Sequence, residues 1–543
     1  MKIDLEKIYL AAFLLVFLLI GPGFLLDHKI EHEFPYGYLA SDAFQHQVRA
    51  EAIKDIGNFK YEAFYISQGF KDAVGRYPPI LAHLAAVISV VSGMETYDSI
   101  ILISFLFISA SSLIFYLIIR KFNEGAAILS LPLSLLVFSK APFTGFLWGH
   151  WPSFLGQFFL IAFIWALANA ELKNSYALIA IFLAGIALGH TVVLFPGLVM
   201  AAAYLISKAA GKELKFADVK NLLIAAVIAV ISSFYYLVIF MNSWAKGNPI
   251  SFSPLIVWDG NPGLYLLDFK LLAVFVAIGI VLSLMRLKNF MAAASVSLLL
   301  LGFGNYITFP DRAFQLRFFW PIYLSFFFGF SAYSLIKIIS KNASKARCIA
   351  VGGIFIFGLA GFVKVPGILQ AEKFSTQGIM DGAHWEVLQW LSKNTPQDSN
   401  LYFFYGDVYN QDAILRNAKR NHYLIDPQDY AKAINERKIK RSYLTERPGD
   451  GGGGTVYKKS FFRFGSHQSE EQTEYFYGQR NICAFDYYVL DKAASHPAFS
   501  GYNMLMASEL LKKDFIKLVF ENKVSVILKN GKPGEDCIEE RDF

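Results

Sequence analysis

Long apolar runs alternate with short polar segments over residues 1–370. The runs that predict membrane-spanning helices lie at 8–26, 97–119, 126–139, 154–170, 176–190, 192–206, 221–241, 266–285, 290–308, 314–336 and 348–366. A helix that crosses a bilayer perpendicularly needs roughly 20 residues. Several runs are shorter, so their ends are approximate, and some spans can be tilted or partly re-entrant. The pattern predicts a polytopic α-helical membrane domain of about 11 spans.

The pattern changes after residue 370, where short apolar stretches lie among many charged and polar residues. Helical periodicity and short buried runs predict five elements in this part of the chain. They are helices at His384–Ser392 and Leu505–Lys513, and strands at Leu401–Tyr405, Tyr487–Leu490 and Val524–Lys529. Helices that alternate with strands predict a small α/β domain over residues 371–543.

Composition supports the membrane assignment. Only 17% of the 543 residues are charged and 55% are hydrophobic, whereas soluble proteins average about 25% charged residues. The net charge of +7 does not indicate a nucleic-acid partner. Much of the excess Lys and Arg lies in short loops between the apolar runs, where it acts on orientation in the bilayer.

The basic loops predict that orientation. Lys and Arg gather in alternate loops, at 120–121, 173, 208–220, 286–288 and 337–347. The short loops between them hold only Lys140, Lys246 and Arg312. Cytoplasmic loops are the basic ones, so we expect the N-terminus inside, and loop 27–78 and the C-terminal domain outside. This requires that the apolar helix near 80–93, at about 14 residues, lies in the interface and does not cross.

The acid Asp42 lies in the first external loop, in the stretch 41–49 (SDAFQHQVR). In a helix, Asp42, His46 and Arg49 fall at i, i+4 and i+7 and share one face. A carboxylate there can accept a proton, and a guanidinium can bind a phosphate. A purely structural alternative is a capping box formed by Asp42 and Gln45, with Gly57 as the glycine that ends the helix.

Two arginines, Arg312 and Arg317, lie near the outer end of the run 314–336. An arginine in the middle of a membrane costs about 2.5–3.5 kcal/mol, so such residues usually mark a function or an interface. The planar guanidinium fits phosphate oxygens. The alternatives are that these side chains reach lipid headgroups, or that Arg312 pairs with Asp311.

His150 lies between two tryptophans in the segment 146–152 (FLWGHWP), in a loop expected outside. Tryptophans are common at membrane interfaces, so an aromatic belt explains this segment. The same rings can stack on a sugar, with His150 reaching a hydroxyl or a phosphate.

The stretch from Asp42 to His46, the segment Ile53–Phe59 and the following Arg76-Tyr77-Pro78-Pro79 resemble the C superfamily of integral-membrane glycosyltransferases. In that superfamily an acid just after the first span is followed by an amphipathic helix and a Tyr-Pro-Pro segment. The number of spans and the external C-terminal domain also match. The resemblance implies that Asp42 contacts the acceptor or a metal, and that Tyr77 belongs to the substrate-binding loop. It further implies that Arg312 or Arg317 holds the phosphate of a polyprenyl donor.

The chain departs from the oligosaccharyltransferase branch of the superfamily. Between Glu124 and Glu171 there is no acid, so the acidic pair of that branch is missing, and its Trp-Trp-Asp-Tyr-Gly run is absent from the sequence. These differences argue against a tightly held divalent metal and against transfer to asparagine sequons. His46 is the nearest candidate co-ligand for Asp42, and two ligands do not make a metal site. No cofactor is therefore assigned, and a divalent metal stays an open alternative.

The leading hypothesis is a membrane glycosyltransferase that moves a sugar from a polyprenyl-phosphate carrier to a glycan, lipid or protein acceptor at the external face. Asp42 would take the acceptor proton, and an arginine would stabilise the departing phosphate, with inversion at the anomeric carbon. His46, Arg49, Tyr77 and His150 would bind substrate. One alternative is a transporter or flippase of a lipid-linked or anionic solute. Another is a non-catalytic membrane scaffold whose outer domain binds a partner.

Two of the three cysteines, Cys483 and Cys537, lie in the C-terminal domain. They can form a disulfide if this domain faces an oxidising compartment. Two unpaired thiols are the alternative at this stage.

Overall fold

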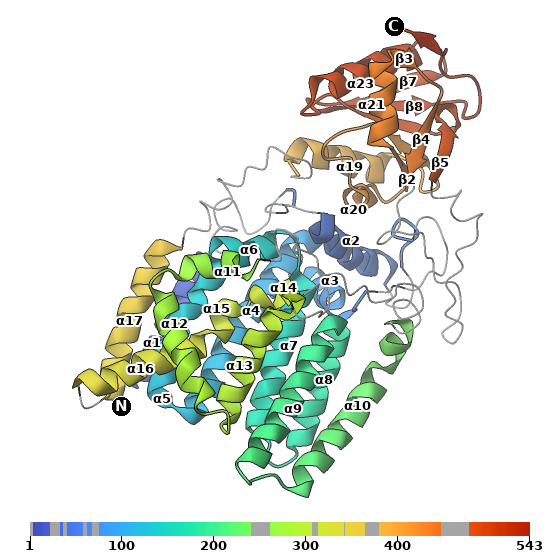
Figure 1. Ribbon diagram of the computed structural model, residues 1–543. Coiled ribbons are helices and arrows are strands. Elements are labelled where there is room, and N and C mark those ends of the chain that lie inside the picture. The colour runs from blue at the N-terminus through green and yellow to red at the C-terminus, as the bar shows by residue number, and fades with distance from the viewer. Residues whose placement is uncertain are drawn as a thin grey trace. The chain divides into compact units, whose positions relative to one another are not determined.

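The computed structural model describes residues 4–21, 33–35, 38, 41–57, 62–67, 75, 77–240, 261–306, 313–340, 343–363, 380–446 and 477–543. The chain forms two compact units (Figure 1). The first consists of residues 1–30, 77–84 and 100–372, and the second consists of residues 31–76, 85–99 and 373–543. Part of the predicted external loop therefore clusters with the C-terminal segment.

The first unit is helical. Its longer helices are α1 (Leu5–Ile20), α4 (Thr96–Phe122), α7 (Trp151–Ala168), α8 (Ser175–Gly189), α9 (Leu194–Ala210), α10 (Phe216–Phe240), α12 (Leu272–Leu284), α13 (Phe290–Gly302), α16 (Ser325–Ser340) and α17 (Lys345–Phe362). Short helical segments complete it: α5 (Glu124–Ser130), η2 (Leu131–Phe138), α6 (Lys140–Leu147), η3 (Thr191–Val193), α11 (Pro262–Leu266), η6 (Leu267–Phe269), η7 (Gly304–Tyr306), α14 (Ala313–Arg317) and α15 (Trp320–Tyr323). Helix α3 (Ile80–Ser92) and the first residues of α4 extend into the second unit.

Six helices of the described residues are long and apolar enough to cross a membrane, or eight if each of two bent pairs is one span. The bends are 57° between Glu124–Phe138 and Lys140–Leu147, and 113° between Pro262–Phe269 and Leu272–Leu284. The chain is thus a multi-pass membrane protein, but the predicted count of 11 spans is not confirmed. Apolar runs at 176–190 and 290–308 form helices of only 15 and 13 residues, which are short for a span.

Glycines allow close helix packing in the first unit. A Cβ at Gly279 of α12 would collide with the backbone carbonyl of Phe327 on α16. Gly329 of α16 packs in the same way against α5. A Cβ at this position would collide with the carbonyl of Ala126 on α5. Small residues let helix backbones approach in this way, and van der Waals packing then replaces the hydrophobic effect that lipid does not supply.

Ion pairs connect several helices at one end of the helical unit. The Glu6 carboxylate accepts a hydrogen bond from Arg120 Nε at 2.6 Å, accepts another from the Tyr116 hydroxyl, and pairs with Lys345. Lys345 also lies 2.8 Å from Glu124. The start of α1, the end of α4 and the start of α17 therefore meet at the same end, as expected of loops on one side of a membrane. Which side faces the cytoplasm stays a prediction.

The second unit contains an α/β domain, as predicted. Its strands are β1 (Asn400–Phe403), β2 (Asn421–Ile425), β3 (Lys438–Ile439), β4 (Ser442–Glu446), β5 (Tyr477–Asn481), β6 (Tyr487–Asp491), β7 (Ile516–Glu521), β8 (Ser525–Asn530) and β9 (Arg541–Asp542). Its helices are α2 (Ser41–Ile56), α19 (Gly382–Asn394), α20 (Asp412–Leu415), η8 (Arg416–Ala418), α21 (Pro427–Asn435), η9 (Ile482–Ala484) and α23 (Pro497–Leu510).

Seven strands form one sheet in the order β5-β4-β2-β1-β6-β8-β7. The central strand β1 is parallel to both β2 and β6, and the outer pairs are antiparallel. β3 and β9 form a separate antiparallel pair. Buried tyrosines fill much of the core beside the sheet, among them Tyr402, Tyr430, Tyr443 and Tyr488.

All five predicted elements of this domain are present, with one large boundary difference. The helix expected to begin at Leu505 begins at Pro497 and ends at Leu510. The His496 side chain accepts a hydrogen bond from the Ala498 amide, and proline at the first helical position already has the backbone angle that a helix needs. The N-cap residue His496 and the following Pro497 therefore start the helix before the predicted boundary.

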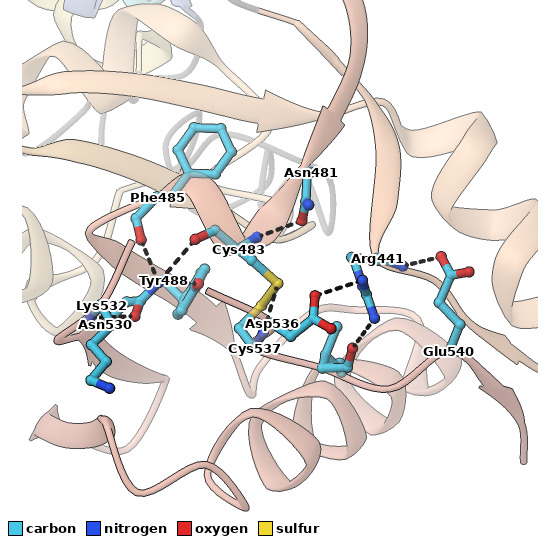
Figure 2. Close-up of a disulfide and its surroundings, with 11 residues drawn as sticks. Arg441, Asn481, Cys483, Phe485, Tyr488, Asn530, Lys532, Asp536, Cys537 and Glu540 are labelled. Carbon is cyan, nitrogen blue, oxygen red and sulfur yellow. Dashed lines mark hydrogen bonds and ion pairs between the residues drawn. A yellow bond between two sulfur atoms is a disulfide. The ribbon is translucent and has the colours of Figure 1, made fainter. Parts of the chain in front are cut away.

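Cys483 and Cys537 form a disulfide (Figure 2), with Cα atoms 5.2 Å apart. It joins η9 to the C-terminal segment, 54 residues away in sequence. Asn530 donates to the carbonyl of Cys483, and Arg441 pairs with Asp536 on the other side of the bridge. The alternative of two unpaired thiols is therefore excluded for this structure.

Candidate active site

Helix α2 forms where the first external loop predicts a helix. Gly57 ends it in the left-handed conformation, with φ +68°, and its amide donates to the Ile53 carbonyl at 2.8 Å. Glycine adopts this conformation at least cost, so its expected role as the terminating residue is confirmed. Helix α2 begins at Ser41, so Asp42 is its second residue and not the N-cap residue that the capping-box interpretation requires. A carboxylate in the first turn also interacts favourably with the helix dipole.

Asp42, His46 and Arg49 share one face of α2 but differ in exposure. Asp42 is exposed, His46 is half-buried and Arg49 is buried. Of the three residues, Asp42 is the most accessible to solvent.

Arg49 is held within the second unit. Its Nε lies 3.3 Å from Glu62 Oε1, and its Nη1 donates to the Gln45 carbonyl at 3.1 Å. These contacts join α2 to the segment 62–67, whose side chains pack on Val48 and Ala52 of the helix. Arg49 therefore has a structural contact that the sequence pattern did not indicate, beside the substrate-binding role predicted for it.

In the first unit the structure brings His150 next to the short helix that carries Arg317. The ring of His150 stacks on Phe318, with centroids 5.3 Å apart and planes at 27°. Its Nδ1 lies 3.4 Å from the side-chain nitrogen of Gln315. Residues predicted from two separate loops are thus neighbours in space.

Arg317 is fully buried. Its Nε donates to the Gly302 carbonyl at 2.6 Å, and its guanidinium carbon lies 5.7 Å from the ring centroid of Tyr265 and 6.0 Å from that of Trp320. These are distances at which a cation is attracted to an aromatic face. The positive charge is enclosed, so a phosphate reaches it only if neighbouring side chains move.

Gln157 is a polar residue of this region that is not among the residues predicted from the sequence. Gln157 of α7 donates to the Gln315 carbonyl at 2.9 Å, and its side-chain oxygen accepts a hydrogen bond from the Tyr323 hydroxyl at 3.1 Å. All of these groups are buried. Gln157 interrupts the apolar run 154–170, and an amide within a predicted span is itself an indication of function or helix contact.

The remaining predicted site residues are Tyr77 and Arg312. Tyr77 is half-buried and belongs to the first unit, three residues before α3 begins at Ile80. Arg312 lies outside the described residues, as does Asp311. Asp42, His46 and Arg49 belong to the second unit, whereas Tyr77, His150 and Arg317 belong to the first.

Among the described residues, no group of three or more His, Cys, Asp or Glu side chains is placed to hold a metal ion. Asp42 and His46 are two possible ligands, and a cation such as Mg²⁺ can take further oxygens from a substrate phosphate and from water.

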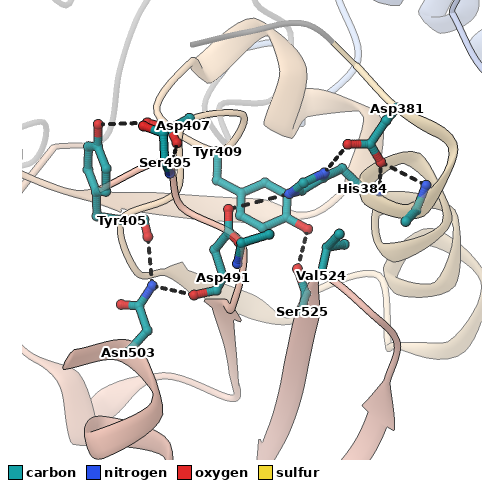
Figure 3. A network of polar contacts seen from close by, with 12 residues as sticks. Asp381, His384, Tyr405, Asp407, Tyr409, Asp491, Ser495, Asn503, Val524 and Ser525 are labelled. Carbon is teal, nitrogen blue, oxygen red and sulfur yellow. Dashed lines mark hydrogen bonds and ion pairs between the residues drawn. The ribbon is translucent and has the colours of Figure 1, made fainter. Parts of the chain in front are cut away.

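A second polar cluster lies within the α/β domain (Figure 3). His384 Nδ1 is 2.7 Å from Asp381 Oδ2, and its Nε2 is 3.4 Å from Asp491 Oδ2. Burial alone would lower the pKa of His384, but its hydrogen bonds to the two carboxylates outweigh this effect and raise the pKa to about 9. The imidazolium thus joins the start of α19 to the end of β6. The cluster is internally satisfied, which is typical of a structural contact.

No family model matches the chain, and no curated protein matches its sequence. Solved structures do match its fold. ArnT from Cupriavidus metallidurans, bound to undecaprenyl phosphate, is 9% identical, with a TM-score of 0.54 over 97% of this chain and 98% of that one. The apo structure of ArnT gives a TM-score of 0.57 over 97% of each chain.

Two larger proteins share the fold. The archaeal oligosaccharyltransferase AglB from Archaeoglobus fulgidus, in complex with an inhibitory peptide and a dolichol-phosphate, is 12% identical, with a TM-score of 0.51 over 77% of this chain and 64% of that one. The arabinofuranosyltransferase AftD from Mycobacteria is 11% identical, with a TM-score of 0.56 over 98% of this chain and 40% of that one. At these identities the likeness establishes the fold, which is the one predicted from the first external loop.

Proposed function

We propose that this chain, which has the fold of the C superfamily of integral-membrane glycosyltransferases, transfers a hexosyl or pentosyl group from a polyprenyl-phosphate carrier to an acceptor at the external face. The observation that carries the proposal is the exposed Asp42, in the first turn of the first-loop helix of a chain with this fold. The solved relatives bound to undecaprenyl phosphate and to a dolichol-phosphate support a donor with a polyprenyl phosphate.

The proposed reaction is a single displacement. Asp42 accepts the proton of the acceptor hydroxyl while its oxygen attacks the anomeric carbon of the donor sugar. The bond between that carbon and the phosphate oxygen breaks, and its electron pair leaves with the polyprenyl phosphate. Attack from the face opposite the leaving group inverts the anomeric centre. The mechanism requires the acceptor hydroxyl to lie within hydrogen-bond reach of Asp42 during the attack.

Arginine at the donor site would stabilise the charge that develops on the phosphate. Arg312 and Arg317 are the candidates, and His150 lies next to the helix that ends at Arg317. Because Arg317 is enclosed by Gly302, Tyr265 and Trp320, it requires a rearrangement to contact a donor. Tyr77, His46 and Arg49 complete the proposed substrate-binding residues, and the α/β domain would select a glycan, lipid or protein acceptor.

The disulfide supports an external position for the α/β domain. Disulfides form and persist mainly in oxidising compartments, outside the cytoplasm. With Cys483 and Cys537 joined, the orientation that the basic loops predict gains an independent argument.

Substitution of Asp42 tests the proposal. Purified full-length protein receives a panel of undecaprenyl-phosphate-linked hexoses and pentoses together with a cell-envelope extract, and product is measured by mass spectrometry. We expect Asp42→Asn to lower transfer by about 10²- to 10⁴-fold, the usual contribution of a general base. Glu535→Gln is the matched control, because it removes an exposed carboxylate of the same unit.

Equal transfer by Asp42→Asn and wild type would remove the catalytic assignment. Counterflow of a lipid-linked solute in liposomes without covalent product would instead identify a transporter. If wild type shows neither transfer nor transport, while Asp42→Asn leaves the phenotype of a deletion strain fully complemented, the scaffold alternative holds.

A further inference from the structure

Helix α2 has a second charged face. Glu51 and Asp55 lie one helical turn apart, and Glu51 follows Asp42 by nine residues, which is about half a turn out of phase around the axis. The two acids therefore lie on the side of α2 away from Asp42 and His46. This side faces the α/β domain within the second unit, where α2 packs on α20 (Figure 1).

Both carboxylates converge on one ammonium of the α/β domain. Lys419 Nζ lies 2.9 Å from Glu51 Oε1 and 2.7 Å from Asp55 Oδ2. The Lys419 side chain is 27% exposed and that of Glu51 is 16% exposed, so solvent screens this pair less than a surface pair. Each carboxylate also accepts a hydrogen bond from a hydroxyl. Thr96 donates to Glu51 at 2.8 Å, and Tyr65 donates to Asp55 at 2.8 Å.

Lys419 is presented by a rigid segment. Its backbone has φ +52°, a left-handed conformation that lysine rarely adopts. Its carbonyl accepts a hydrogen bond from Arg420 at 2.8 Å, and the Arg420 side chain is fixed in turn by Thr395 and Ser392. Upstream, Asp412 of α20 lies 2.7 Å from His422. A lysine with a rare backbone conformation and two ion pairs indicates a position where the side chain has a specific role.

Electrostatics favour a charged Lys419. Burial alone would lower the pKa of this ammonium, but the Glu51 and Asp55 carboxylates outweigh burial and raise the pKa. The contact therefore persists through the neutral pH range.

We propose that Lys419 is a positioning residue, which docks α2 on the α/β domain through Glu51 and Asp55 and so sets the orientation of Asp42 at the acceptor. The inference rests on the proposed function for its catalytic part and on geometry alone for its docking part. This contact would fix α2 relative to the α/β domain. An acceptor bound by the domain would then approach Asp42 in a fixed geometry.

Lys419→Asn is the informative variant, because asparagine tolerates a positive φ and removes only the ammonium and its stem. In full-length protein we expect amide hydrogen exchange over residues 41–56 to become about 10-fold faster, because the docking contacts of the helix are lost. With the undecaprenyl-phosphate panel we expect kcat to fall about 10-fold at an unchanged KM for the donor, because displacement of a catalytic group slows the reaction without loosening donor contacts.

Two controls sharpen the test. Lys419→Arg keeps the charge and should restore kcat and slow exchange to near wild-type values. Lys432→Gln, on the exposed face of α21 with 67% of its side chain accessible, removes one charge from the same domain and should change neither quantity. Faster exchange confined to residues 41–56, together with lower kcat, supports the proposal.

Unchanged exchange over residues 41–56 in Lys419→Asn would overturn the docking role. Faster exchange with wild-type kcat would overturn the positioning role. If the wild type itself transfers no sugar, the proposed function fails and the positioning role fails with it, while exchange still decides the docking of α2. Failure of each part is therefore seen in a different measurement.

Discussion

At the residue scale, single charged side chains acquire roles that their immediate sequence does not reveal. Arg317 lies at a predicted membrane mouth, yet it is fully buried and donates to a backbone carbonyl. Helical spacing places Arg49 on the same face as Asp42, yet Arg49 forms an ion pair with Glu62. Spacing along a helix therefore predicts which side chains share a face, and long-range contacts determine which of them remain accessible.

The arginines give a residue-scale prediction about the donor. We expect Arg312→Ala, or Arg317→Met, which keeps the apolar stem, to weaken binding of undecaprenyl phosphate about 10-fold, the usual effect of losing a charge-assisted hydrogen bond. Microscale thermophoresis of detergent-solubilised protein measures this Kd. Lys288→Ala, in a loop expected on the opposite side, should leave the Kd unchanged. An unchanged Kd in both arginine variants would exclude the phosphate role.

At the element scale, polar side chains decide how helices are joined to the sheet and to one another. His384 links α19 to β6 through two carboxylates, and Gln157 links α7 to α14 and α15. Neither link follows from the apolar periodicity that predicts the helices themselves. A buried polar residue on an amphipathic helix indicates that a partner exists, but the partner comes from elsewhere in the chain.

His384 makes the attachment of α19 depend on pH. Its pKa in the folded protein, about 9, lies above the ordinary value of 6.5. Its contribution is therefore fully present below pH 6.5 and is lost as the pH rises through about 9. We expect the protection of residues 382–394 against amide exchange, corrected for intrinsic rates, to fall over this interval by a free energy on the order of 2 kcal/mol. His384→Gln should remove this pH dependence, and equal protection of the wild type at both pH values would contradict it.

At the scale of the whole molecule, the basic loops and the disulfide both bear on the orientation of the chain in the membrane. Basic loops predict an inward N-terminus, and the ion pairs of Glu6, Arg120 and Lys345 place three of the expected cytoplasmic segments at one end of the helical unit. The disulfide of the α/β domain favours an oxidising surrounding. The two arguments use different residues and reach the same topology.

A reporter fusion tests that topology. In a bacterial host, alkaline phosphatase fused after Phe543 should be active, because this enzyme requires an oxidising compartment, whereas a fluorescent protein that folds only in the cytoplasm should stay dark at the same position. The reverse pattern, with an inactive phosphatase and a fluorescent fusion, would overturn the external assignment of the α/β domain. A fusion after Ser340, in a predicted cytoplasmic loop, is the internal control.

The local elements of this protein can be predicted from its amino-acid sequence. Apolar periodicity, proline and glycine placement, and the change of composition near residue 370 predicted the multi-pass helical part, the α/β domain and helix α2, because these features depend on neighbours a few residues apart. The first-loop stretch around Asp42 and Tyr77 also indicated the fold that the solved structures share.

Which of those elements contact one another follows from the three-dimensional fold. The contact between Glu51 and Lys419 joins residues 368 positions apart, and the contact between Gln315 and His150 joins residues 165 positions apart. The bends that lower the number of straight spans, the burial of Arg317 and the pairing of Cys483 with Cys537 are of the same kind. They depend on packing between distant segments, and a local pattern of residues carries no information about which distant segment will cover it.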